Sequence, residues 1–147
     1  MSNPAVLHKI LSIREQAKKD AQMEQITAQN YFEKVATQLY NLLKTKEKAE
    51  ETLRANMGTT LAIEKIKEQS TYIDTLNKHI IQLEKQVQKA RREMELKQKV
   101  LTEAHIEMKK IEKIIERRTE EQKQFEKKQQ MNLMDEISIQ QFTAQNR

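Results

Sequence analysis

Asn56-Met57-Gly58-Thr59-Thr60 decides the fold, because it holds the one glycine of a 147-residue chain that also has only one proline. Glycine just past a helix can take the left-handed conformation without a Cβ penalty. Thr59 or Thr60 can cap a following helix. Since turns depend on glycine and proline, the chain makes very few turns. The stretch therefore predicts one tight turn, at 57–59, between two helices.

Before the turn, the sequence predicts a helix over about 4–56. Asn3 suits the N-cap and Pro4 suits the first helical position. At a rise of about 1.5 Å per residue, this helix spans roughly 80 Å. Its apolar residues follow a frame of alternating three- and four-residue spacings, which polar residues interrupt at Arg14, Lys18, Gln25 and Lys46. The apolar members are Leu7, Leu11, Ala21, Ala28, Phe32, Val35, Leu39, Leu42, Ala49 and Leu53.

After the turn, a heptad pattern predicts a helix over about 60–142, which spans roughly 125 Å on the same rise. The apolar seam of this helix stays in phase over seven heptads, from Ile66 to Ile115. A run of that length indicates a coiled coil. Beyond Ile115 the seam positions become polar, so the pairing is expected to stop near there.

These features predict an all-α fold, a long two-helix antiparallel coiled-coil hairpin that forms a single domain over 1–147. The second helix is longer than the first. With a tight turn, Val35 is expected opposite Ile80, and Lys46 opposite Gln69. Lys18 and Lys97 would face one another. The second helix then has no partner from about 112 onward.

Composition excludes most other classes of protein. Charged residues make up 33% of the chain and aromatic residues 4%, and the chain contains neither cysteine nor tryptophan. The lack of cysteine excludes disulfides and thiolate sites. No apolar run is long enough to span a membrane, and the N-terminus does not resemble a secretory signal. We therefore expect a cytoplasmic protein.

Catalytic, metal and nucleic-acid sites are not expected. His8, His79 and His105 lie far apart on the flanks of the seam, and the paired glutamates lie on solvated faces. With one glycine there is no phosphate-binding loop, so we predict no enzyme activity, cofactor or metal. The net charge of +5 comes without dense basic clusters and stacking aromatics, so no nucleic acid is expected.

Two groups of residues stand out as candidate interaction sites. Gln38, Leu42, Tyr72 and Leu76 fall on the stripes beside the seam, on the edges that an antiparallel pair brings to one side. Either the leucines belong to the core and Tyr72 covers them, or the four form a docking patch. In the unpaired end of the second helix, a further apolar group requires a covering partner or frays. This group consists of Phe125, Leu133, Met134, Ile137 and Phe142.

The sequence resembles the FliJ family, small coiled-coil proteins of the bacterial flagellar type III export apparatus. The resemblance rests on the total length, the turn at Met57-Gly58, the segment Tyr72-Ile73-Asp74-Thr75-Leu76, and the ending Met134-Asp135-Glu136-Ile137-Ser138-Ile139-Gln140-Gln141-Phe142. It covers nearly the whole chain.

The resemblance implies a non-enzymatic stalk that links a hexameric export ATPase to a membrane export gate and escorts export chaperones. It also implies a location on the cytoplasmic face of the cell membrane at the flagellar base. Gln38, Leu42, Tyr72 and Leu76 match the family's gate-docking stripe, whereas Thr45, Ala49, His79 and Leu83 depart from its commoner residue types. The terminal apolar group, Phe125 to Phe142, would then contact the ATPase ring.

One alternative stays open at this point, a dimeric structural coiled coil with no export role. In such a dimer the second helix would pair with its own copy, because heptad seams permit either partner. The single turn glycine favours the hairpin. A hairpin stalk is expected to be a monomer when isolated, so its mass in solution separates the two.

Overall fold

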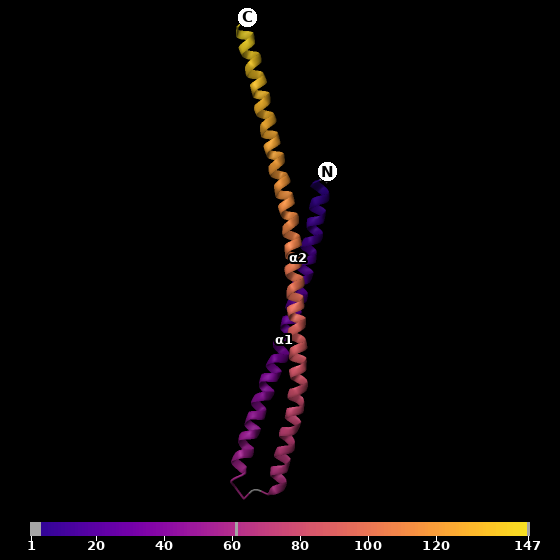
Figure 1. Ribbon diagram of the computed structural model, residues 1–147, viewed down its shortest axis with the longest axis vertical. Coiled ribbons are helices and arrows are strands. Elements are labelled where there is room, and N and C mark those ends of the chain that lie inside the picture. The colour runs from indigo at the N-terminus through magenta and orange to yellow at the C-terminus, as the bar shows by residue number, and fades with distance from the viewer. Residues whose placement is uncertain (1–3, 61, 147) are drawn as a thin grey trace. The chain divides into compact units, whose positions relative to one another are not determined.

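The computed structural model describes residues 4–60 and 62–146. It consists of two helices, α1 (Pro4–Asn56, 53 residues) and α2 (Ile63–Gln145, 83 residues), and the described residues contain no strand. Figure 1 shows the two helices joined by a short connection. The all-α class, the two packed helices and the greater length of the second are therefore confirmed. Asn3, the expected N-cap, lies outside the described residues.

The chain divides into two compact units. The first, which we call the terminal unit, comprises Met1–Lys18 and Ala104–Arg147. The second, the turn unit, comprises Lys19–Glu103. Each unit contains a piece of α1 and a piece of α2, so each packs the two helices along the same apolar seam.

α1 ends without the left-handed glycine that the sequence predicts. The N–H of Met57 donates to the carbonyl of Leu53 at 3.1 Å, which continues the helical hydrogen bonding past Asn56. Thr59 then donates to the carbonyl of Asn56 twice, from its backbone N–H at 3.2 Å and from its hydroxyl at 2.9 Å. No glycine has a positive φ, so the prediction for Gly58 is wrong. The threonine replaces it in closing the helix.

α2 begins at Ile63, about three residues later than predicted. The carbonyl of Ala62 accepts hydrogen bonds from the N–H groups of Lys65 and Ile66 at 3.0 and 3.4 Å. Ala62 therefore occupies the N-cap position that the sequence assigns to Thr59 or Thr60. The connection runs from 57 to 62 instead of 57 to 59.

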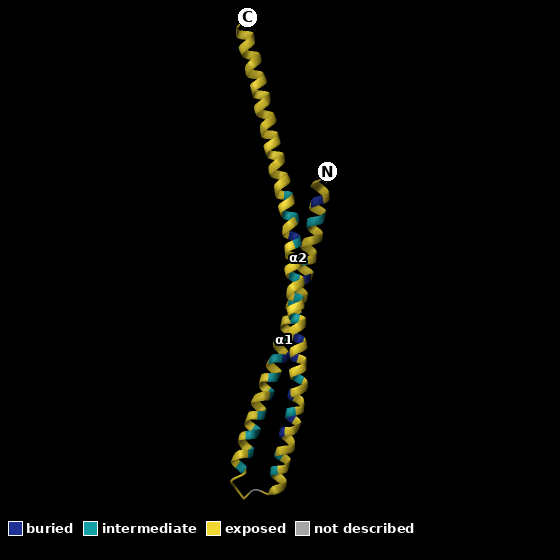
Figure 2. Ribbon diagram, viewed as in Figure 1, coloured by how far each residue is buried: buried dark blue, intermediate teal, exposed yellow. Residues whose placement is uncertain are grey.

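The core of the hairpin is a narrow apolar strip on the facing sides of the helices. Figure 2 shows this strip in blue and teal, with exposed residues elsewhere. Among the described residues no buried position is polar or charged. The buried positions all belong to the predicted seam, and they are Leu7, Ala21, Val35, Ile73, Leu76, Ile80, Val87, Ala90 and Met108.

The register of the turn unit differs from the predicted one by one heptad. Val35 packs in one cluster with Val87 and Ala90, where Ile80 was expected as its partner. Phe32, on the neighbouring turn of α1, lies under the guanidinium of Arg91, 5.7 Å from the ring centroid. The connection is three residues longer than predicted, and this extra length contributes to the seven-residue shift, because every residue added to it moves the seam of α2 along α1.

In the observed register Lys97, which was expected to face Lys18, has a partner of opposite charge. Lys97 pairs with Glu24 on α1, with Nζ 3.3 Å from Oε2. Continuing the register toward the turn puts Lys46 level with Leu76, one heptad from its predicted partner Gln69. Lys46 extends along its own helix instead, with Nζ 3.6 Å from a carboxylate oxygen of Glu50.

In the terminal unit, α1 covers α2 farther than predicted. Leu7 and Met108 are buried, and Ile115 is half-buried. Every residue from 116 to 146 is exposed. The uncovered part of α2 therefore begins at 116, instead of at about 112.

Candidate functional site

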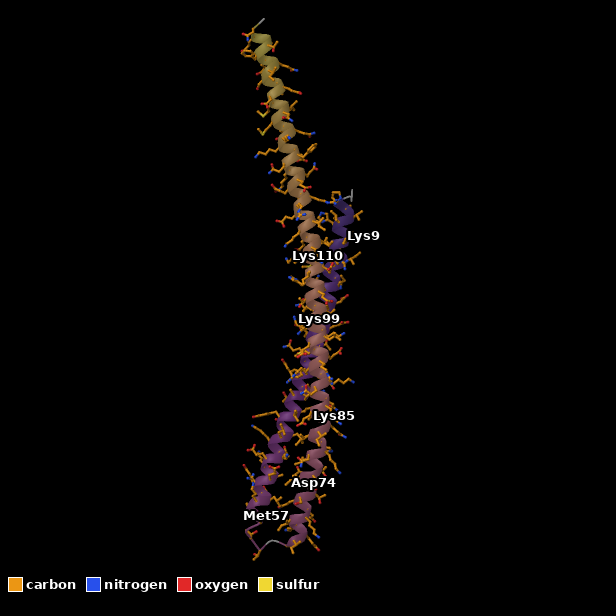
Figure 3. The ribbon with its side chains drawn as sticks, in the orientation of Figure 1. Lys9, Met57, Asp74, Lys85, Lys99 and Lys110 are labelled. Atoms are coloured by element: carbon orange, nitrogen blue, oxygen red, sulfur yellow. The ribbon has the colours of Figure 1, made fainter. Side chains whose placement is uncertain are left out.

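The uncovered end of α2, residues 116–146, is the first candidate surface. Figure 3 shows side chains around this part of α2, past the beginning of α1, on which Lys9 is labelled. Every member of the apolar group expected from the sequence is exposed, namely Phe125, Leu133, Met134, Ile137 and Phe142. Met131 and Ile139 are exposed as well. Both are large apolar residues in the same stretch of sequence, so this pattern could have added them to the predicted apolar group.

The exposed apolar side chains surround α2 and do not form a single stripe. At 3.6 residues per turn, Leu133, Met134 and Ile137 project to one side of the helix. Met131 and Phe142 project to the other side, as do Ile139 and Phe125. No side of this segment is consistently polar, so a partner that touches only one side would leave half of these side chains in water.

An open groove of about 760 Å³ lies in the terminal unit where α1 begins. Leu7 and Ile115 provide apolar surface between the helices, and Phe125 lies at the groove's far end on α2. The remaining lining is mainly polar and charged, and consists of Pro4, His8, Arg118, Thr119, Glu121, Gln122 and Lys123. The groove connects the start of α1 with the first residue of the exposed apolar group.

The four residues of the second candidate surface differ in burial. Tyr72 is 51% exposed and Gln38 is exposed, whereas Leu42 is half-buried and Leu76 is only 5% exposed. Leu76 thus belongs to the seam and offers little surface while the helices stay packed. Of these four residues, Gln38 and Tyr72 are the ones whose side chains are exposed to a partner.

The register also redistributes these residues along the turn unit. Gln38 and Leu42 lie level with the Ile80–Leu83 part of α2, whereas Tyr72 and Leu76 lie level with the Thr45–Ala49 part of α1. The expected single patch of four is therefore drawn out into a band. The four other residues of the stripe fill the band between and beside them, namely Thr45, Ala49, His79 and Leu83.

Electrostatic effects at these surfaces are modest. In the terminal unit, Lys110 on α2 donates to a carboxylate oxygen of Glu107 at 3.0 Å. This hydrogen bond, with the charge of Lys110 and a smaller effect of Arg14 on α1, lowers the pKa of Glu107 from its ordinary value. In the turn unit, the ammonium of Lys44 lies 4.7 Å from the ring centroid of Tyr40.

The three histidines do not form a ligand set. Among residues 4–60 and 62–146, no group of three or more His, Cys, Asp or Glu side chains is arranged to hold a metal ion. In the same part of the chain, neither helix contains an apolar stretch long enough to cross a membrane.

Two sequence comparisons with known proteins indicate one family. The family model described as "Flagellar FliJ protein" matches residues 4–147. The Flagellar FliJ protein of Bacillus subtilis (strain 168) is 31% identical over 137 residues, which cover 93% of this chain and 93% of that protein. No solved structure matches the chain.

Proposed function

The chain belongs to the FliJ family of flagellar proteins, and we propose that it acts as a non-enzymatic stalk in flagellar protein export. The stalk links a hexameric export ATPase to the cytoplasmic region of a membrane export gate. It also escorts export chaperones. It works in the cytoplasm, peripherally associated with the cytoplasmic face of the cell membrane at the flagellar base.

The uncovered end of α2 carries this proposal. Its apolar side chains project to all sides of one helix, from Phe125 to Phe142. Burial of one large apolar side chain contributes about 1.5–3 kcal/mol, and a flat surface would bury only some of them. A ring of subunits around a central hole encloses a helix completely. A hexameric ATPase offers such a hole, which is why this end is assigned to the ring.

The band beside the seam of the turn unit is assigned to the export gate. Two of its exposed members, Gln38 and Tyr72, combine a hydrogen-bonding amide with an amphipathic ring, and aromatic residues are enriched at interfaces. Neither side chain is needed to fill the seam, since both are exposed. Leu42 and Leu76 position the band by holding the helices together beneath it.

The assignment of the uncovered end is tested by two matched substitutions. Leu133→Asp places a charge in the apolar group, and Asn132→Asp places the same charge one residue earlier, at a polar position. We expect Leu133→Asp to weaken binding to the hexameric flagellar export ATPase at least about tenfold, equivalent to about 1.4 kcal/mol, and to abolish stimulation of ATP hydrolysis. Asn132→Asp should retain both. If the two variants bind and stimulate the ATPase equally well, the proposed contact between this end of α2 and the ATPase ring is wrong.

The second candidate function is a dimeric coiled coil with no export role, favoured by the same uncovered stretch of α2. Light scattering of the purified chain distinguishes the two by mass. We expect a monomer at micromolar concentration. A stable dimer that neither binds nor stimulates the export ATPase would support the structural role instead.

A further inference from the structure

The turn unit contains a buried polar atom without a partner. The Oε1 of Gln69, at a seam position of α2, is shielded from solvent and accepts no hydrogen bond. In the observed register Gln69 is level with Leu53 of α1, which offers no donor. Buried amide oxygens are almost always hydrogen-bonded, so this register leaves one buried acceptor unsatisfied near the turn end of the seam.

Gly58 is a second residue that does not match the observed register, because nothing in the observed structure requires a glycine at this position. Its φ is not positive, so it does not need the conformational freedom that distinguishes glycine. A Cβ atom added to it would meet nothing within 4 Å. Neither backbone geometry nor steric crowding therefore requires a glycine in this conformation of the turn.

At the start of α2, too, the residue types do not match the roles that the observed structure gives them. Thr59 and Thr60 are residues that favour the N-cap position, whereas alanine is a poor N-cap. Yet Ala62 occupies that position, and the Thr59 hydroxyl donates back to Asn56 at the end of α1. The sequence thus carries capping residues that the observed start of α2 passes over.

A single displacement would use all three features. If α2 moves by one heptad along α1, away from the turn, Lys46 comes level with Gln69 and its ammonium can donate to the orphan Oε1. The connection shortens to a few residues, with Gly58 just past α1 and a threonine at the start of α2. Apolar residues still meet in the turn unit, because Val35 is then level with Ile80 and Leu42 with Ile73.

We propose that the turn unit has two registers one heptad apart, the observed one and the displaced one. Contacts specific to the observed register oppose the displacement. They are the ion pair between Lys97 and Glu24 at 3.3 Å, the stacking of Arg91 over Phe32, and the two hydrogen bonds from Thr59. Because each register satisfies polar groups that the other leaves unpaired, a bound partner can select between them.

The displacement would also rearrange the band beside the seam. In the observed register Tyr72 is level with Ala49, and in the displaced register it is level with Leu42. Seven residues at about 1.5 Å per residue correspond to a movement of about 10 Å. A partner that contacts Tyr72 and Gln38 at the same time would therefore bind the two registers differently.

Distance measurement by pulsed electron spin resonance tests the proposal on the full chain. The natural sequence has no cysteine, so Lys48→Cys with Lys99→Cys gives two labelling sites at exposed positions on opposite helices. The displaced register increases the separation of these labels by about 10 Å. We expect two maxima separated by that amount, the shorter one corresponding to the observed register.

Substitutions at Gln69 shift the two maxima in opposite directions. Gln69→Glu creates a charge pair with Lys46 only in the displaced register, so the longer maximum should grow. Gln69→Leu packs against Leu53 in the observed register, so the longer maximum should disappear, as it should with Gly58→Ala. Gln82→Glu and Gln82→Leu, at an exposed position of α2, serve as matched controls. Both should show the same distribution of label distances as the parent.

One short maximum in both the parent and Gln69→Glu would overturn the proposal, provided that circular dichroism shows the variant to be helical. So would a longer maximum that Gln69→Leu and Gln82→Leu reduce equally, since the shift would then have no relation to the seam. A longer maximum in the parent or in Gln69→Glu that is lost in Gln69→Leu but kept in Gln82→Leu supports two registers.

Discussion

Lys97 of α2 reaches Glu24 of α1, with Nζ 3.3 Å from Oε2, across 73 positions of sequence. The same ammonium lies 3.8 Å from a carboxylate oxygen of Glu93 on its own helix. This bridge records the register of the turn unit, because a shift of one heptad would carry Lys97 away from Glu24. A lysine can occupy a seam position because its long stem can cover apolar surface while its charge stays in water.

Removing the bridge should have a small effect on stability. Glu24→Gln is expected to lower the free energy of unfolding by no more than about 1 kcal/mol, because both side chains are partly exposed. The difference from the parent should shrink as salt is added. Urea unfolding at low and high salt measures it, with Glu93→Gln as the control that removes only the contact within α2. A loss of several kcal/mol would mean that the bridge is far less hydrated than its exposure indicates.

A charge in the centre of the seam should disrupt the hairpin. Val35 is 3% exposed and lies in the cluster with Val87 and Ala90, so Val35→Asp buries an unpaired carboxylate. Such burial costs several kcal/mol, comparable to the stability of a small domain. Helical circular dichroism should fall sharply, while Thr37→Asp, at an exposed position two residues on, should remain helical. Undiminished helicity in Val35→Asp would refute the described core.

Tyr72 and Tyr40 form a matched pair for testing the gate surface. They are 51% and 57% exposed, but only Tyr72 belongs to the band beside the seam. Tyr72→Ala and Tyr40→Ala should each shift the melting temperature by a few degrees or less. Binding to the cytoplasmic region of the export gate should weaken with Tyr72→Ala alone. If Tyr72→Ala destabilises the chain and leaves binding unchanged, its ring serves the core.

The end of α2 should exchange its amide hydrogens rapidly in the free protein. Residues 120–142 are helical but exposed throughout, and packing supplies most of the stability of protein helices. Binding to the export ATPase should slow the exchange. Deuterium uptake with and without the ATPase measures this, and 73–90 serves as an internal reference. Strong protection in the free protein, or no change on binding, would contradict the prediction.

Acidification should remove a small contribution of Glu107 to stability. Its pKa is lowered mainly by the hydrogen bond from Lys110, so folding favours the ionised form. The contribution is therefore complete above the ordinary carboxyl pKa and is lost as the pH falls through the lower pKa of the folded state. A carboxyl-carbon NMR titration should show this lowered pKa, and Lys110→Ala should raise it. An unchanged titration in Lys110→Ala would exclude the hydrogen bond as the cause.

The sequence alone determined that the chain is two helices with one connection near Gly58. Helix-forming residues, the scarcity of glycine and proline, and the period of the seam act locally, so they can be interpreted without the partner helix. The same local pattern identified Phe125, Leu133 and Ile137 as apolar residues beyond the end of the seam. It also placed Tyr72 at the edge of the seam, where the structure leaves it exposed.

The tertiary structure decided how the helices are aligned. A seam that repeats every seven residues fits its partner nearly as well after a shift of one repeat, so periodicity alone cannot choose between Ile80 and Val87 as the neighbour of Val35. The choice depends on contacts between distant residues, such as Lys97 with Glu24, and on how Thr59 closes α1. These contacts exist only once the helices are side by side, and they set which residues are level with Tyr72 in the band.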